Sequence, residues 1–216
     1  MALAFPLSTA AFMDLLGVGQ ITFDAPPQVE ANGTGGGEIM TAELGPMLWT
    51  GSVSLGALTL PESATPEVLL DVLGPPGRSF YAYDTRRPAP LADPTGVILG
   101  AAAPTISTLH ANNRDVALTG LPVGYVLTRG DYLAFTASAS RALHRIVTAS
   151  VTANGAGTTP NFEVTPRIRP GASIGLAVTL VKASCKAVLV PGSVSKGRSG
   201  KTITREMSFR FSQTLR

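Results

Sequence analysis

Charged residues are scarce in this chain. Of its 216 residues, 14% are charged and 44% are hydrophobic, whereas about a quarter of the residues are charged in an average soluble domain. The apolar content is sufficient for a full core, which excludes a disordered chain. A surface with so little charge indicates that partner molecules cover part of it. A monomer with a surface rich in Ser, Thr and Gly is the alternative.

Cysteine and long hydrophobic runs are also lacking. The single cysteine, Cys185, excludes an internal disulfide, and its place in an alternating apolar run predicts a buried, unreactive thiol. No window reaches the eighteen or so apolar residues of a membrane span. The apolar N-terminal stretch contains Asp14 and no preceding Lys or Arg, so we expect no signal peptide. We expect synthesis in a reducing cytoplasm and no membrane partner.

Patterns of catalytic or metal-binding residues are missing as well. His110 and His144 stand alone, without Cys, Asp or Glu at ligand spacing, which argues against a metal site. The chain has no G-x-S-x-G elbow, and its carboxylates are scattered. We therefore expect no enzyme, no catalytic residue and no cofactor.

One segment resembles a phosphate-binding loop without its context. Residues 195–202, SKGRSGKT, end in the GKT of such a loop. A phosphate-binding loop opens a helix, whereas the ITREMSFRF that follows alternates as a strand does. We interpret residues 194–202 as the mobile, basic tip of a hairpin.

What the chain does contain is clearest in residues 38–84, which are predicted to form a strand, a second strand, one short helix and a third strand. From Met47 to Leu55 apolar residues alternate with Thr and Ser, which predicts a half-buried strand. A helix of about two turns should follow, with Thr65 as N-cap and Gly74 as its end. The face predicted to pack on a sheet consists of Val68, Leu69, Val72 and Leu73. Aromatic residues on both sides of the strand at 78–84 predict cover by the helix and by a second layer, which could be a neighbouring subunit.

The remaining segments predict a small second β domain. Residues 31–37 are a flexible loop by composition, and the proline-rich residues 85–96 form a linker. Short strand signals recur between 97 and 169 and predict a small barrel or sandwich. Alternating runs at 176–181 and 207–212, joined by the basic loop, should return to the first sheet.

Charge is distributed unevenly along the chain. From Lys182 onward there are eight basic residues and one acidic residue, a net charge of +7, whereas the rest carries nine basic and thirteen acidic residues, a net charge of −4. A basic element on an acidic body is compatible with contact with nucleic acid and equally with an acidic partner subunit. The lack of aromatic residues interleaved with these basic residues argues against nucleic-acid binding as the main role.

Six segments, in this order, resemble the distal tail proteins of long-tailed bacteriophages and of related gene transfer agents. They are ELGPMLWTGSVSLG, FYAYDTRRPAPLADPTG, GLPVGYVLTRGDYLAF, ALHRIVTASV, FEVTPRIRPG and MSFRFSQTL. The acidic, Trp-containing segment that the family usually has before its last strand is replaced here by the basic loop.

The resemblance implies a structural virion protein at the tail tip, assembled in the host bacterial cytoplasm. It implies a ring, usually a hexamer, that connects the tail tube protein to the baseplate hub protein and leaves a lumen for DNA passage. The expected fold is mainly β. A β-sandwich or barrel belt domain with one short α-helix comes from residues 1–85 and 171–216, and a small inserted β-barrel comes from 86–170.

Seven residues are candidates for contacts in such a ring. The aromatic candidates, which could equally belong to the core of one subunit, are Trp49, Phe80, Tyr81 and Tyr83. The basic candidates for contact with a neighbouring ring, with a solvated loop as the alternative, are Lys196, Arg198 and Lys201.

Two other functions remain open from the sequence. A tail tube or tail terminator protein shares the design of a sheet with one helix. A carbohydrate-binding β domain for host attachment would require exposed aromatic residues on loops.

Overall fold

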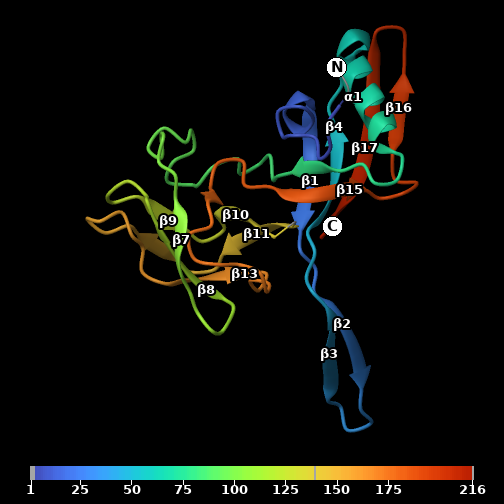
Figure 1. Cartoon of the computed structure of the whole chain (residues 1–216). Helices are drawn as coiled ribbons and strands as arrows, with labels where there is room; N and C mark the ends of the chain where they lie inside the picture. The colour runs from blue at the N-terminus through green and yellow to red at the C-terminus, as the bar shows by residue number, and fades with distance from the viewer. Residues whose placement is uncertain (1–2, 139, 216) are drawn as a thin grey trace.

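A computed structural model describes residues 3–138 and 140–215. The fold is mainly β, with a nearly closed barrel-like sheet and a half-barrel sheet, as expected from the sequence (Figure 1). Each of the two main sheets has its own hydrophobic core. The helices of the described residues are the 3-10 turn Met13–Leu15 and the α-helix α1, Leu60–Leu73. Neither is long and apolar enough to cross a membrane.

The first sheet is antiparallel and has the order β1-β4-β17-β15-β6, with β5 and β16 also paired to β17. Its strands are β1 Val18–Asp24, β4 Thr50–Leu55, β5 Leu58–Thr59, β6 Phe80–Ala82, β15 Cys185–Leu189, β16 Ser195–Ser199 and β17 Ile203–Gln213. One face carries the core, where Trp49, Val53 and Leu55 are buried as predicted.

The second sheet has the order β14-β10-β11-β13-β8-β7. Its strands are β7 Thr105–Leu109, β8 Asp115–Thr119, β10 Tyr132–Ala137, β11 Ser140–Ile146, β13 Phe162–Thr165 and β14 Val178–Thr179. A small pair, β9 Val126–Thr128 and β12 Ser150–Thr152, lies beside it. The proline-rich segment 85–96 contains no strand or helix, as predicted. A last pair, β2 Gln28–Gly33 and β3 Ile39–Gly45, forms a separate hairpin.

The predicted start of the helix is wrong. α1 begins at Leu60 rather than at Pro66, because the Glu62 carboxylate accepts hydrogen bonds from the Thr59 amide and hydroxyl at 2.9 and 2.8 Å and fixes an earlier first turn. Pro66 lies inside the helix on its buried face. That face consists of Ser63, Pro66, Leu70 and Leu73, so the predicted face was also partly wrong: Leu70 is buried and Val68 is exposed.

Three other segments differ from their predictions. Residues 31–33, predicted to be loop, belong to β2. Residues 195–199, predicted to be a mobile tip, form β16, because their backbone pairs with β17. The alternating run 176–181 supplies β14 to the second sheet rather than the first, since Val178 faces Phe135 of β10 and is buried in the second core.

A glycine in the first sheet provides a test of its register. Gly51 lies between β1 and β17 and faces inward; a Cβ there would overlap the Thr22 carbonyl oxygen and lie 2.6 Å from the Phe211 ring. We expect Gly51→Ala to lower the free energy of unfolding by at least about 2 kcal/mol, since backbone must move. Gly56→Ala is the control, because its Cβ would meet its nearest neighbour at 3.7 Å. Equal urea midpoints for the two variants would contradict the register.

Candidate functional site

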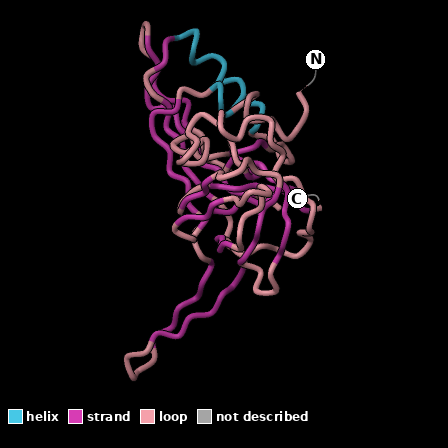
Figure 2. The backbone as a smooth tube through the Cα atoms, turned by 90° about the vertical axis from the view of Figure 1, so that its left-hand side faces the viewer, coloured by secondary structure: helices cyan, strands magenta, loops and turns pink. Residues whose placement is uncertain are grey.

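The hairpin of β2 and β3, which we call the arm, projects from the body of the molecule (Figures 1 and 2). All residues of β2 and all of β3 except Gly45 are exposed. Exposed apolar side chains lie along it, including Ile39 at 74% and Leu44 at 68%. An isolated two-stranded ribbon is only marginally stable in water, and its free edges can pair with another chain. The arm is therefore a surface that a partner would complete.

The arm is also acidic. Residues 26–46 contain Glu30, Glu38 and Glu43 and no Lys or Arg, a net charge of −3. Two arms laid side by side would bring like charges together, which is unfavourable. A partner surface that is neutral or basic therefore fits the arm better than a second arm does.

A groove of about 820 Å³ lies between the base of the arm and the second sheet. Val29 and Leu44 of the arm form one wall, and Val164 and Ile168 belong to the other. Two ion pairs lie at the groove, Arg167 with Glu43 at 3.8 Å and Arg114 with Glu163 at 3.7 Å. The groove is thus lined mainly by apolar atoms and by two ion pairs. Arg169 also lines it, and its guanidinium donates a hydrogen bond to the Met47 carbonyl at 3.1 Å but none to a carboxylate among the described residues.

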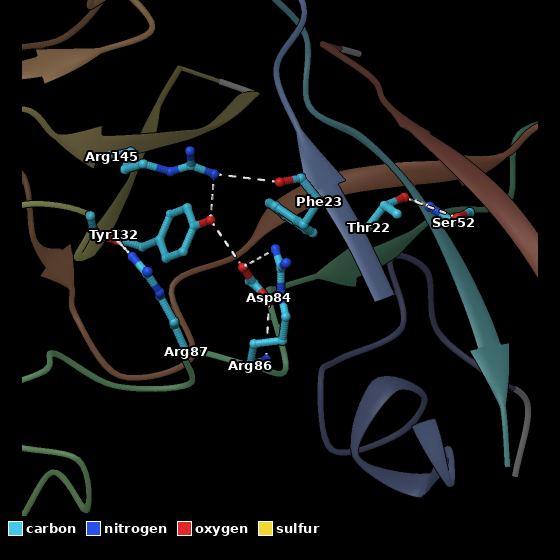
Figure 3. A network of polar contacts seen from close by, with 9 residues as sticks. Thr22, Phe23, Ser52, Asp84, Arg86, Arg87, Tyr132 and Arg145 are labelled. Carbon is cyan, nitrogen blue, oxygen red and sulfur yellow. Dashed lines mark hydrogen bonds and ion pairs between the residues drawn. The ribbon is translucent and has the colours of Figure 1, made fainter. Parts of the chain in front are cut away.

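A polar network joins the two sheets (Figure 3). Arg86 donates two hydrogen bonds of 2.9 Å to Asp84, and the Tyr132 hydroxyl donates to the same carboxylate at 3.1 Å. Arg145 donates to the Tyr132 oxygen at 2.7 Å and to the Phe23 carbonyl at 3.4 Å. Burial raises the pKa of Asp84, but the bonds from Arg86 and Tyr132 outweigh it and hold that pKa below its usual range. A charged carboxylate therefore anchors the junction.

The aromatic candidates lie within the chain's own core or junction. Trp49 is buried, and its indole N–H donates to the Leu143 carbonyl of the second sheet at 2.7 Å. Phe80 is fully buried. Tyr81 is half-buried, with the Arg141 guanidinium 5.3 Å from its ring. The Tyr83 hydroxyl donates to Asp14 at 2.6 Å; burial and this carboxylate raise the pKa of Tyr83.

The basic candidates are only partly free. The Lys196 ammonium lies 2.7 Å from Asp71 and 3.7 Å from Glu67 of α1, and the hydrogen bond to Asp71 raises its pKa. Arg198 lies 3.6 Å from Glu206, whereas Lys201 is exposed in the β16–β17 turn. Two of the three cations therefore have acidic partners in their own chain.

The described residues offer little for catalysis or metal binding. No group of three or more His, Cys, Asp or Glu in this part of the chain could hold a metal ion. Cys185 is buried as predicted, and burial raises the pKa of its thiol to about 12. His144 is buried with its Nδ1–H donating to the Pro166 carbonyl at 2.7 Å, and burial lowers its pKa to about 4.

No protein-family model matches the chain, and no curated protein matches it in sequence. The features that describe the site are the arm, the groove and the polar junction between the sheets.

Sequence reasoning predicted a strand at the position of β3 but missed its pairing with β2, and it missed the groove. The signal for the arm is present, because QVEA and EIMTAEL flank a Gly-rich turn of the kind that joins two strands. No signal could have revealed the groove, since one wall comes from residues between 27 and 47 and the rest of its lining from residues between 113 and 170.

The junction predicts a measurable loss of stability. In Tyr132→Phe, Asp84 loses a donor and Arg145 loses an acceptor at a buried site, so we expect unfolding to become easier by about 1–3 kcal/mol. The control is Tyr81→Phe, at a half-buried tyrosine outside this network. It should change the free energy of unfolding by less than about 0.5 kcal/mol. Urea unfolding measures both, and similar losses for the two variants would argue against the junction.

Buried His144 predicts a specific dependence of stability on pH. Its pKa of about 4 in the folded chain lies below the ordinary value of 6.5, so the unfolded chain binds more protons between these values. The contribution of neutral His144 to the free energy of unfolding is fully present above pH 6.5. It declines as the pH falls towards 4, by about 3 kcal/mol in all.

Comparison with His144→Gln isolates this effect, because the carboxylates titrate in both proteins and glutamine can still donate to the Pro166 carbonyl. Unfolding free energies between pH 7 and 4 should fall more steeply for the wild type. Parallel curves would show that His144 is not buried in its neutral form.

Proposed function

We propose that the protein is a structural subunit of a virion tail ring, the distal ring that connects the tail tube to the baseplate hub. The observation that carries this proposal is the arm, which exposes apolar side chains and two unpaired strand edges. A ring supplies each arm with a neighbouring copy. The choice of a phage-tail ring among possible assemblies rests on the six segments that, in their order, resemble distal tail proteins.

The division of the chain supports the same proposal. The first sheet with α1 is suited to the belt, and the second sheet, inserted between β6 and β15, is suited to a unit that projects outward. The Asp84 network and the Trp49 hydrogen bond hold these units together. A subunit under mechanical load during DNA passage benefits from such a junction.

The open face of the first sheet is suited to a lumen. Thr22 of β1, Ser52 of β4 and Arg210 of β17 lie in one row across it, and Ser54 and Ser208 lie in the next. Hydroxyls hold phosphates far more weakly than closely spaced cations do. Such a face would let DNA slide past.

Two alternatives fit less well. A tail tube protein stacks on itself in many layers, whereas a distal protein stops after one or two. The presence of the second unit favours the distal position. A carbohydrate-binding domain uses exposed aromatic platforms. Every aromatic side chain within the described residues is buried or half-buried, which disfavours that function.

Shortening the arm tests the proposal. Val29 faces Glu43, so residues 30–42 can be replaced by an Asn-Gly turn that keeps β1 connected to β4. The removed side chains are exposed, so we expect the free energy of unfolding to change by less than about 1 kcal/mol. Ring formation should be lost, because the strands that contact the neighbouring copy are missing.

Native mass spectrometry and electron microscopy of the full chain provide the readout. The wild type should form closed rings, alone or with a tube or hub protein. Deletion of Gly35 and Gly36 at the arm tip keeps both strands and should keep the rings. A wild-type chain that stays monomeric at high concentration and with tail partners would overturn the proposed function.

A further inference from the structure

A loop of the second unit presents two apolar side chains in a fixed geometry. Asp93 is buried, and its carboxylate accepts hydrogen bonds from the amides of Ile98 and Leu99 at 3.2 and 2.8 Å and from the Tyr125 hydroxyl at 3.4 Å. Leu99 is buried in the second core. The loop is therefore anchored from both sides, although it lacks regular secondary structure.

The tip of this loop is exposed. Val97 is 76% exposed and Ile98 is 59% exposed. From 88 to 101 the buried Asp93 is the only charged residue, so the tip can enter an apolar site without desolvating a charge. A preorganised loop also loses little conformational entropy on binding. These are the properties of an anchor for a protein contact.

The same chain contains an apolar groove that could receive this tip. Its volume of about 820 Å³ lies within the range of roughly 300–1,000 Å³ that is usual for pockets with buried ligands, enough for two branched side chains. Leu44 of the arm, exposed by 68% in the isolated chain, lines it. Two ion pairs account for four of the five charged side chains that line the groove. The fifth, Arg169, is a cation without an acidic partner among the described residues, so an occupant without positive charge fits best.

The tip and the groove lie at opposite ends of the second unit, so one chain cannot join them. The loop leads into the start of β7 at Thr105, whereas Asn113 and Arg114, which line the groove, follow the other end of β7 (Figure 1). A contact between them joins two copies head to tail. Such a contact closes into a ring when the rotation between copies permits it.

We propose that Val97 and Ile98 of one copy insert into the groove between the arm and the second sheet of the next copy. This inference rests on the proposed ring and names one contact in it, in addition to the contact made by the strands of the arm. It also explains why the base of the arm is exposed in a single chain, since its groove-side residues Val29 and Leu44 would be covered by the neighbour.

Matched substitutions of exposed apolar residues test the contact. We expect Val97→Asp and Leu44→Asp each to weaken self-association at least about tenfold in sedimentation experiments, because each places a carboxylate in an apolar site. Ile174→Asp is the control: Ile174 is 67% exposed and lines neither surface. Urea unfolding should show that all three variants fold as the wild type does.

Mixing the two defective variants gives the decisive result. Val97→Asp retains an intact groove and Leu44→Asp retains an intact loop, so an equimolar mixture should form a heterodimer and nothing larger. A mixture that stays monomeric would overturn the pairing of loop with groove.

The wild type separates this inference from the proposed function. If Val97→Asp assembles into rings as readily as the wild type, the loop–groove contact is wrong and the ring function stands. If the wild type itself never assembles, with or without tail partners, the ring function fails first. Weaker assembly of Ile174→Asp, equal to that of Val97→Asp, would also reject the contact, because the effect would not depend on position.

Discussion

The junction between the two sheets is the constraint on which the rest of the structure depends. Tyr132 and Leu143 of the second sheet belong to the core of the first, and Trp49 donates a hydrogen bond back across the boundary. The charged Asp84 lies at this boundary and accepts hydrogen bonds from Arg86 and from Tyr132 of the second sheet. Because side chains of the second sheet pack into the first core, the second-sheet wall of the groove is held beside the base of the arm.

Assembly is the function that this arrangement supports best. The aromatic side chains lie mainly in the interior of the fold. The exposed apolar side chains are aliphatic, and examples are Ile39 in the arm and Val97 in a loop of the second unit. Each of these exposed groups is small compared with a full interface, but several together would give a continuous contact when copies meet around an axis. The scarcity of charge along the chain fits the same account.

The sequence was sufficient where local patterns determine the structure. Alternation fixed the burial of Trp49 and Val53, and the prolines after Asp84 predicted a segment without strands. It failed at the helix start because the local capping pair of Thr59 and Glu62 was overlooked. It failed at Lys196 because α1, which is distant in the sequence, supplies its acidic partners. The arm and the groove could not be derived fully, because pairing across a Gly-rich turn and contact between separate units depend on the folded chain.

Hydrogen exchange of the arm amides tests the central claim most directly. In a single chain the edges of β2 and β3 face solvent, whereas in an assembly a neighbouring copy should cover at least one face of the arm. We predict that residues 28–45 exchange rapidly in the monomer and become protected, together with residues 97 and 98, once rings form. Equal exchange of these amides in the monomer and the assembled particle would contradict the account.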